Sequence, residues 1–500
     1  MRILFINPNL RPGHSIRYLP VGLAYVMTVV RQAGHDFDLL DIGLYDYSDA
    51  QVEDYLASHA YDVVLTGSIV THYKWMKWLT RAVRRHQPQA TIVAGNSVGG
   101  SIPEVFLGHS EADVVVIGEG EYATLDLLDC LGRNGDLGQV PGIAYRGDDG
   151  RVIRTARRPA VDIDGIPRPD WTLFDVDQYF EITDAPSAFG VEEGEHATWR
   201  TMPVSTARGC VFSCSFCHIV FQHDPYRHRK TEAIVEEVGA AIDTYGANYV
   251  NFWDDLTFYK LSQAEKVVDG LLDSGHRFAW SAAVRTDLFG NPKIPYEKRL
   301  EVAHKFKQSG CVALGYSLES GNQQILELMN KRIRAEWFAE QVAILREAGI
   351  TSNTSVVFGY PIETRETIRE TFAMCESVGV YPSVGFLLPL PDTGMYTYAL
   401  EHGYIRDENA FLDSITERQD ICLNMTQMQD QEILDEITRG CGRLNEQLGL
   451  GLSEESYVRT GGYRKHTKPR NEGRPERNTN DVSFNYSNQL FDMGPEDGRE

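Results

Sequence analysis

The chain has 500 residues, 71 of them acidic and 48 basic, and its formal net charge of −23 argues against nucleic acid or an anionic membrane as the main partner. Its length and its 42% of hydrophobic residues predict two or three domains. The eight cysteines, three of them in one short motif, do not make a disulfide framework, and long apolar runs are absent. We therefore expect a soluble protein of the reducing cytoplasm with no membrane partner, and residues 1–6 read as a strand rather than a signal peptide.

The first 145 residues alternate short apolar runs with amphipathic segments. Helices are expected over residues 21–33 and 75–86, and strands over 2–6, 37–40, 62–66, 91–94 and 113–117. Continuous Val, Ile and Leu runs separated by helices indicate a parallel sheet that is buried on both faces. Residues 1–145 are thus predicted to form a doubly wound α/β domain of flavodoxin or Rossmann type, with its ligand beyond the carboxyl ends of the strands.

Glycines follow several of these strands, where they let a large ligand approach the backbone. With the loop Gly118-Glu-Gly-Glu121 in place, the domain resembles the cobalamin-binding domains of the B12-binding family. The resemblance implies that Ser68 and the pair Gly95 and Asn96 lie around the nucleotide tail of cobalamin, and that Gly118 and Glu119 also contact the cofactor. The alternative is a flavodoxin-like module with a lost or a different ligand.

The first loop departs from the pattern of domains that ligate cobalt through histidine. Those domains carry Asp-x-His-x-x-Gly, whereas here His14 has Pro12 before it and Arg17 after it. We therefore expect no protein histidine on cobalt, and we interpret His14 and His72 as polar loop residues.

A connector is expected over residues 146–200. The segments 142–145 and 152–155 flank Asp149-Gly150, which is a turn sequence typical of a hairpin. A proline-stiffened linker follows over residues 166–171, and the acidic stretch 191–195 reads as a solvated loop or as a flank of the site.

Three cysteines with Cys-x3-Cys-x2-Cys spacing, Cys210, Cys214 and Cys217, follow a strand-like run over residues 203–207. Thiolates select iron–sulfur clusters, zinc or Cu(I), and a [4Fe–4S] cluster normally takes four of them. Three close cysteines without a fourth therefore suggest a cluster with one open iron. The alternatives are a zinc site, with His218 or His223 as a fourth ligand, and a chance occurrence of the three cysteines.

Strand and helix alternation resumes after these cysteines. Helices are expected over 232–245, 262–272, 296–307 and 366–376 and between 323 and 348, and strands over 248–252, 278–281, 312–316, 352–357 and 383–387. With the strand before the cysteines, this makes six parallel strands in a partial TIM-like (β/α)6 barrel over residues 201–395. The chemistry of such folds lies at the carboxyl ends of the strands.

The cysteine spacing, with Phe216 just before the third cysteine, resembles the signature of the radical S-adenosylmethionine (SAM) enzymes. In that family the open iron chelates SAM, and electron transfer cleaves SAM to a 5′-deoxyadenosyl radical. The resemblance implies a [4Fe–4S] cluster on the three cysteines and SAM at the strand ends beside them.

The landmarks of this family occur here at successive strand ends. The resemblance places the SAM amino group at Asp254 or Asp255, the ribose at Ser317 and Glu319, and the adenine beside the loop that contains Gly359. Arg285 is the candidate for the SAM carboxylate, since a guanidinium suits carboxylate geometry. A helix cap is the alternative for one of the two aspartates, and a surface ion pair is the alternative for Arg285.

The C-terminal part, residues 396–462, is predicted to hold helices over 396–404 and 429–448 that cap the open side of the barrel. From residue 463 to 500 the chain is rich in Arg, Lys, Asn, Gly and Pro and reads as disordered or loosely attached.

The combined resemblance is to cobalamin-dependent radical SAM enzymes. It implies an enzyme that methylates an unactivated carbon of a small-molecule or natural-product intermediate, using methylcobalamin and the adenosyl radical, with electrons from a donor such as flavodoxin or ferredoxin. The alternative is a rearrangement, ring contraction or oxidative cyclisation with the same cofactors. A cobalamin or SAM sensor is a further alternative, which the intact Cys210, Cys214 and Cys217 disfavour.

Overall fold

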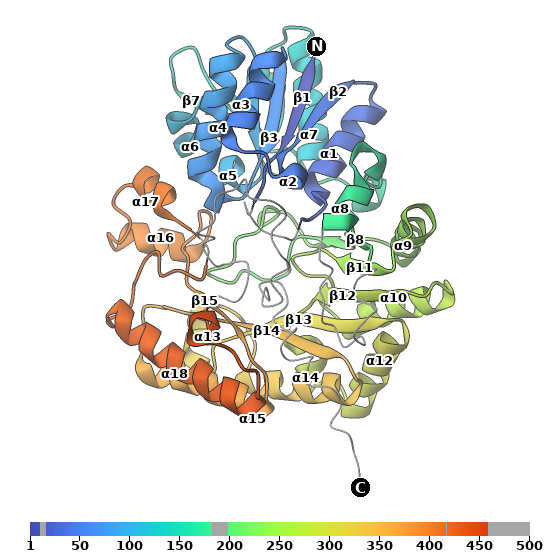
Figure 1. The fold of residues 1–500 in the computed structure, drawn as a ribbon, viewed down its shortest axis with the longest axis vertical. Coiled ribbons are helices and arrows are strands. Elements are labelled where there is room, and N and C mark those ends of the chain that lie inside the picture. The colour runs from blue at the N-terminus through green and yellow to red at the C-terminus, as the bar shows by residue number, and fades with distance from the viewer. Residues whose placement is uncertain (11–16, 183–198, 417, 459–500) are drawn as a thin grey trace. The chain divides into compact units, whose positions relative to one another are not determined.

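The structure is a computed structural model that describes residues 1–10, 17–182, 199–416 and 418–458 (Figure 1). The expectations for His14, for the acidic stretch 191–195 and for the tail 463–500 lie outside these residues. The chain divides into two compact units. The first contains residues 1–182, 217–225 and 390–416, and the second contains residues 183–216, 226–389 and 417–500.

The first unit is built on one seven-stranded sheet with the order β2-β1-β3-β4-β5-β6-β7. Its strands are β1 (Ile3–Asn7), β2 (Phe37–Asp41), β3 (Val63–Gly67), β4 (Thr91–Gly95), β5 (Val114–Val116), β6 (Ile143–Arg146) and β7 (Val152–Arg154). The first five strands pair in parallel, which confirms the doubly wound fold. Strand order reverses at β1, and a ligand of such a sheet lies beyond the carboxyl ends at that point.

Helices cover both faces of this sheet (Figure 1). The helices of this part of the unit are α1 (Val21–Gln32), α2 (Ile42–Tyr45), α3 (Asp49–Ser58), α4 (Tyr73–His86), α5 (Ser97–Gly100), α6 (Pro103–His109), α7 (Gly120–Gly132) and α8 (Val176–Ile182), with short 3₁₀ turns at Val70–His72, Leu137–Gln139, Ile163–Gly165 and Trp171–Leu173. Helix α1 packs against α7, and α3 packs against α4. The continuous apolar strands are buried because both faces are covered in this way.

The predicted hairpin is part of this sheet rather than a free connector. β6 pairs with β5 in antiparallel register, with Ile143 opposite Val116, and β7 continues on β6. Ile143 and Ala144 of β6 are fully buried. Because β7 lies past residue 145, the sheet of the first unit continues beyond the expected boundary.

The second unit is built on six parallel strands in the order β15-β14-β13-β12-β11-β8, which confirms the partial barrel topology. The strands are β8 (Thr201–Val204), β11 (Tyr249–Phe252), β12 (Ala279–Ala283), β13 (Cys311–Glu319), β14 (Thr351–Phe358) and β15 (Ser383–Phe386). A separate two-stranded ladder joins β9 (Ala207–Arg208) to β10 (Arg227–His228). The cysteine loop lies between these two short strands, and Gly209 before it takes a φ of +81°.

Aromatic rings join one face of this sheet to its helices, which lie along it in Figure 1. The helices are α9 (Thr231–Tyr245), α10 (Leu261–Asp273), α11 (Asp287–Gly290), α12 (Tyr296–Gln308), α13 (Gln323–Leu328), α14 (Ala335–Glu347) and α15 (Arg365–Val378). Trp280 of β12 contacts Phe306 of α12 with ring centroids 5.3 Å apart, and Phe358 of β14 stacks on Phe372 of α15 at 5.6 Å. This face is therefore the helix-covered side of the barrel.

The segment after the last barrel strand divides between the two units. Helices α16 (Gly394–Glu401) and α17 (Glu408–Ser414) lie in the first unit, where the buried Lys77 of α4 donates to Asn409 at 2.9 Å and pairs with Asp413 at 2.7 Å. Helix α18 (Asp430–Leu448) packs against α15 in the second unit, and a 3₁₀ turn (Glu454–Ser456) follows it. Within the described residues, no helix is both long and apolar enough to cross a membrane.

Candidate functional site

The cysteine loop is held in place by residues between its cysteines. The backbone N–H of Ser215 donates to the Met329 carbonyl at 2.9 Å, and the Ser215 hydroxyl donates to the Leu328 carbonyl at 3.0 Å. The Asn330 side-chain amide donates to the Ser213 carbonyl at 2.8 Å. The segment around the end of α13 therefore fixes the loop through the serines that lie between its cysteines.

Arg285 also holds this loop. Its guanidinium carbon lies 3.4 Å from the ring centroid of Phe212, which stands between the first two cysteines. The guanidinium donates to Asp287 at 3.0 Å and to the Lys331 carbonyl at 2.6 Å. Arg285 is thus buried against the loop rather than on the surface. Its predicted contact with the SAM carboxylate would need guanidinium N–H groups that these two hydrogen bonds do not use.

None of Cys210, Cys214 and Cys217 is in a disulfide. Cys217 is exposed, the other two are half-buried, and burial raises the pKa of Cys210. Among the described residues, no three His, Cys, Asp or Glu side chains are already gathered as metal ligands would be. The donor set fits a cluster because three soft thiol donors share one anchored loop, and their role as ligands stays a prediction.

One of the two histidines that a zinc site could recruit, His218, is engaged elsewhere. His218 Nδ1 is 2.9 Å from the Pro391 carbonyl oxygen, and Nε2 is 3.4 Å from the Ser101 hydroxyl, all within the first unit. A zinc ligand needs one ring nitrogen free for the metal, so this arrangement disfavours His218 as the fourth ligand.

The two aspartates after β11 have different surroundings. Asp254 accepts from the Thr206 hydroxyl at 2.7 Å and from the backbone N–H groups of Thr206 and Ala207 at 2.9 and 3.0 Å. Asp254 thereby holds in place the segment between β8 and β9, which leads into the cysteine loop. Asp255 is exposed to solvent, and desolvation together with repulsion from Asp254 raises its pKa to about 6. Asp255 is therefore the better placed of the two for a ligand.

The strand end of β13 carries the predicted ribose contacts. Ser317 shares a hydrogen bond of 2.8 Å with Ser355 of β14. Glu319 is buried, has a φ of +62°, and forms a 2.8 Å ion pair with Lys331. A non-glycine residue in this conformation is strained, and such strain gathers at functional sites.

Lys331 is a residue of this site that the sequence analysis missed. Burial alone would lower the pKa of Lys331, but electrostatic interaction with Glu319 and Cys214 raises it. The Lys331 ammonium lies 5.9 Å from the ring centroid of Phe216. It thus links the carboxylate at the end of β13 to the cysteine loop. The signal that could have pointed to Lys331 is that a carboxylate such as Glu319 needs a cation as its partner when it is buried.

The loop after β14 adds an aromatic contact and a buried acid. Tyr360 meets Phe216 edge-on at 6.2 Å, and its hydroxyl is 3.3 Å from the Ser215 hydroxyl. Gly359 takes a φ of +103°, which favours glycine. Glu363, which the sequence analysis did not select, is buried beneath this loop, and desolvation raises its pKa to about 7.

The carboxyl edge of the first sheet carries the predicted cobalamin positions. The Ser68 hydroxyl is buried and has no hydrogen-bond partner among the described residues. A Cβ on Gly67 would lie 3.1 Å from the Gly95 backbone, so β3 and β4 end in close contact. Asn96 takes a φ of +62°, and its side chain accepts from Ser97 N–H at 2.6 Å. The buried Ser68 hydroxyl without a partner, next to strand ends that carry glycines, fits a bound cofactor group.

The loop before α7 is open on one side. Gly118 has a φ of +78° and nothing within 4 Å of a Cβ placed on it. The Glu119 carboxylate accepts from Val161 N–H at 3.3 Å, which holds the connector to this loop. Gly118 therefore leaves room for a ligand, while Glu119 has a structural contact.

A buried polar group at the ends of β1 and β2 was not foreseen. The Asn7 amide donates to Asp41 at 2.7 Å, and the Tyr179 hydroxyl of α8 donates to the same carboxylate at 2.9 Å. Desolvation raises the pKa of Asp41. His72 Nε2 lies 2.7 Å from the Leu10 carbonyl oxygen, in keeping with a polar loop residue.

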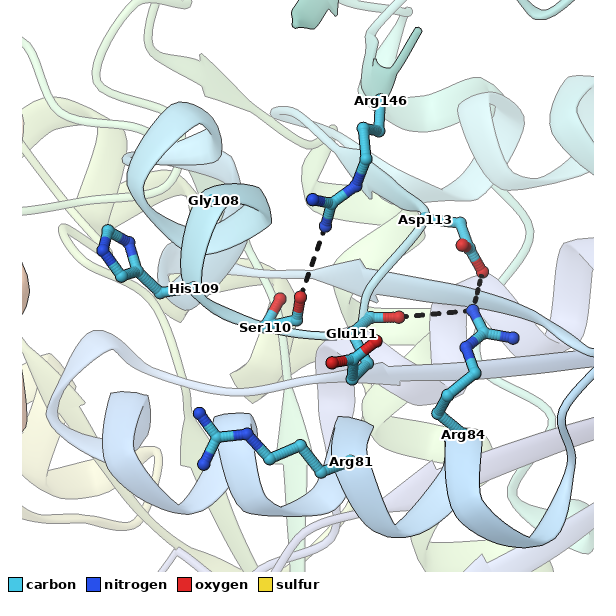
Figure 2. Close-up of a pocket in the computed structure, with 8 residues that line it drawn as sticks. All are labelled: Arg81, Arg84, Gly108, His109, Ser110, Glu111, Asp113 and Arg146. Atoms are coloured by element: carbon cyan, nitrogen blue, oxygen red, sulfur yellow. Dashed lines mark hydrogen bonds and ion pairs between the residues drawn. The ribbon is translucent and has the colours of Figure 1, made fainter. Parts of the chain in front are cut away.

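Figure 2 shows a pocket of about 540 Å³ in the first unit. Its lining residues are Arg81, Arg84, Gly108, His109, Ser110, Glu111, Asp113 and Arg146. Arg84 donates to Asp113 at 2.6 Å, and Arg146 donates to the Leu107 carbonyl at 2.5 Å. Asp113 directly precedes β5, so this pocket lies at the amino edge of the sheet, away from the edge where cobalamin is expected.

Two family models match the chain. The radical SAM superfamily model matches residues 204–375, and the B12 binding domain model matches residues 17–128. A radical SAM domain implies a [4Fe–4S] cluster and SAM, and a B12-binding domain implies cobalamin.

Curated relatives are similar over most of the chain. An uncharacterized methyltransferase of Pyrococcus horikoshii is 26% identical over 78% of this chain and 80% of its own. A cytidylyl-2-hydroxyethylphosphonate methyltransferase of Streptomyces wedmorensis is 24% identical over 87% of this chain and 88% of its own. An anaerobic magnesium-protoporphyrin IX monomethyl ester cyclase of Rubrivivax gelatinosus is 26% identical over 75% of this chain and 65% of its own.

Solved structures share the fold. The radical SAM methyltransferase TsrM from Kitasatospora setae gives a TM-score of 0.62 at 18% identity, covering 81% of this chain and 77% of that one. The cobalamin-dependent radical SAM enzyme OxsB gives 0.65 at 17% identity, covering 86% and 58%.

Proposed function

We propose that this chain, which joins a B12-binding domain to a radical SAM domain, is a cobalamin-dependent radical SAM methyltransferase acting on an unactivated carbon of a small molecule. The observation that carries the proposal is the presence of both domains in one chain. The relatives named as methyltransferases favour methylation over the alternatives.

Each cofactor is assigned its own set of residues. Cys210, Cys214 and Cys217 hold the cluster, while Asp255, Ser317 and Glu319 face SAM, with Phe216 and Gly359 beside it. Ser68, Gly95, Asn96 and Gly118 lie around cobalamin. When bound, these cofactors supply a transferable methyl group and an adenosyl radical, which are chemistries that no side chain provides.

The chain's own contribution is positioning. Arg285 on Phe212 keeps the cysteine loop in one conformation, and Lys331 orients the Glu319 carboxylate for hydroxyl donors. Asp254, through its hydrogen bond with Thr206, holds the segment that leads into that loop. Fixed geometry of this kind lowers the entropic cost of bringing reactants together.

Methylation of a C–H bond consumes two molecules of SAM. One gives its methyl group and becomes S-adenosylhomocysteine, and the other accepts an electron and yields methionine and, after hydrogen abstraction, 5′-deoxyadenosine. Each turnover therefore takes up two electrons, one to cleave SAM and one to balance transfer of the methyl group to the substrate radical, and both come from a reduced donor such as flavodoxin or ferredoxin. The absence of a disulfide among the described cysteines is consistent with a reducing cytoplasm.

The test is anaerobic turnover of the reconstituted enzyme with SAM labelled in its methyl group. We expect label in the product, with S-adenosylhomocysteine and 5′-deoxyadenosine rising together. A matched reaction without reductant should form neither 5′-deoxyadenosine nor labelled product.

A second candidate function is a cyclisation or rearrangement, which the cyclase among the relatives favours. A product that forms with 5′-deoxyadenosine, but without label or S-adenosylhomocysteine, would replace the methyltransferase assignment with this one.

A further inference from the structure

The inner face of the barrel sheet is lined by small polar side chains. Strand register places Asn251 beside Ser281, Gly315 beside Asn353 and Ser317 beside Ser355. These residues alternate along their strands with Trp280, Tyr316 and Phe358, which contact the helices. They therefore face away from the helices and into the barrel.

This composition is unusual for a barrel interior. Barrel interiors are commonly filled by layers of Val, Ile and Leu side chains. Here, large apolar side chains lie at the amino end of the strands. Trp199 stacks on Tyr249 with ring centroids 4.5 Å apart, and Ala313 belongs to the same buried cluster. Above that floor the inner face carries hydroxyl and amide groups instead of apolar bulk.

In the middle of this face, open space in front of Gly315 lies next to the side-chain amide of Asn353, which has an unsatisfied oxygen. A Cβ on Gly315 would meet only the Ala282 carbonyl, at 3.8 Å, so the position in front of it is open. Its neighbour Asn353 has a buried Oδ1 without a hydrogen-bond partner among the described residues. An unsatisfied buried amide is costly unless a ligand or water completes its bonds.

The upper rim of the same face is also polar. Ser317 and Ser355 share a 2.8 Å hydrogen bond, and the guanidinium of Arg418 donates to Ser383 at 2.9 Å. A Cβ on Gly385 would lie 3.1 Å from Arg418 Nη1, so this glycine lets the arginine lie against the strand. The rim therefore offers both donors and acceptors.

We infer that the barrel interior binds a polar part of the substrate, and that the substrate is a hydrophilic small molecule with hydroxyl, amide or carbonyl groups rather than an apolar polycycle. The inference rests on the proposed function, since it names the substrate class of the same site. Asn353 and Ser355 bind such groups directly, and Gly315 gives them room. An apolar substrate would leave these side chains unpaired, which strongly lowers its binding and turnover.

The experiment supplies the anaerobic holoenzyme with methyl-labelled SAM, a reductant and a small-molecule extract of the source organism. Labelled products are then partitioned between water and chloroform after SAM and its own products are removed. We expect the labelled product in water. Labelled product in chloroform would overturn the inference while leaving the methyltransferase proposal intact.

Two neighbouring variants locate the effect. Asn353→Leu should lower the labelled product formed per 5′-deoxyadenosine about tenfold, which corresponds to about 1.4 kcal/mol for a lost hydrogen bond. Thr354→Val changes the helix-facing side of the same strand and should stay within about twofold of the parent enzyme. Equal effects of the two variants would contradict a direct contact at Asn353.

A substrate-independent measurement covers the case in which no labelled product appears. A crystal structure of the holoenzyme under xenon should show ordered water bonded to Asn353 and Ser355 and no xenon, because polar cavities hold water and apolar ones bind xenon. Xenon at this place without ordered water would overturn the inference. Ordered water without labelled product would count against methylation and in favour of the polar site.

Discussion

Lys331 and Glu319 form a buried ion pair at the point where the end of β13 meets the cysteine loop. Each charge loses its hydration there, so each depends on the other for compensation. Because the Lys331 carbonyl also receives the Arg285 guanidinium, the same residue supports two of the predicted SAM contacts.

Removing one charge of this pair should therefore cost more than removing both. Lys331→Met should lower the free energy of unfolding by about 3–5 kcal/mol, because it leaves Glu319 buried and unpaired. The double variant Glu319→Leu with Lys331→Met should regain most of that loss in urea unfolding. It should still fail to form 5′-deoxyadenosine, since the proposed ribose contact is gone. A double variant as unstable as the single one would show that the pair is not the cause.

Glu363 predicts a specific dependence of stability on pH. Desolvation raises its pKa from 4.5 to about 7, so the folded protein keeps a proton that the unfolded chain releases above pH 4.5. Stability from this group is therefore fully present below pH 4.5 and is lost as pH rises to 7, at up to about 1.4 kcal/mol per pH unit. Glu363→Gln should remove this loss in urea unfolding at pH 5, 6 and 8. The exposed Glu366→Gln control should keep the parent slope, and an unchanged slope in Glu363→Gln would contradict the assignment.

For individual residues, the sequence predicted which residues lie at the strand ends better than it predicted which residues they contact. Ser317 and Glu319 could be placed because strand ends follow from apolar runs. Lys331 could not, because its partner lies across a turn and a helix whose path depends on tertiary packing. The different surroundings of Asp254 and Asp255 likewise depend on which of them reaches Thr206.

The elements themselves followed closely from periodicity. Helix α18 was expected over residues 429–448 and is found at Asp430–Leu448. Its apolar stripe faces α15, and the two helices approach closely where Gly440 meets Phe372. The hairpin of β6 and β7 was foreseen as a hairpin, but its pairing with β5 was not, because edge pairing is decided by tertiary contacts.

The close approach of α18 and α15 can be tested with two glycines of the same helix. A Cβ on Gly440 would lie 2.3 Å from the Phe372 ring, so Gly440→Ala should destabilise the protein by about 1–3 kcal/mol despite the better helix propensity of alanine. At Gly442 the added Cβ would lie at an ordinary 3.6 Å from Tyr457, so Gly442→Ala should be neutral or stabilise by up to about 1 kcal/mol. Thermal unfolding of both variants gives the comparison, and a stable Gly440→Ala variant would mean that the helices can separate at no cost.

The chain forms two units whose composition could not be read from the sequence. Residues 217–225 and 390–416 lie in the unit of the B12-binding domain, although the chain around each segment belongs to the barrel. Contacts such as Arg157 to the His223 carbonyl and Lys77 to Asp413 hold these segments there. Such pairs join residues far apart in sequence, and no local pattern predicts them.

If the cofactor sites are built from separate residue sets, loss of one cofactor should leave the other bound. Replacing Cys210, Cys214 and Cys217 together by Ala should reduce iron from about four per chain to almost none and abolish 5′-deoxyadenosine formation. Cobalamin binding, followed by its absorbance, should persist because Ser68, Gly95 and Gly118 lie at or just after the ends of β3, β4 and β5 in the first sheet. Cys422→Ala, a change at a cysteine outside the triad, should retain both iron and cobalamin. Zinc in place of iron in the parent protein would refute the cluster, and loss of cobalamin with the triad would refute the independence of the two sites.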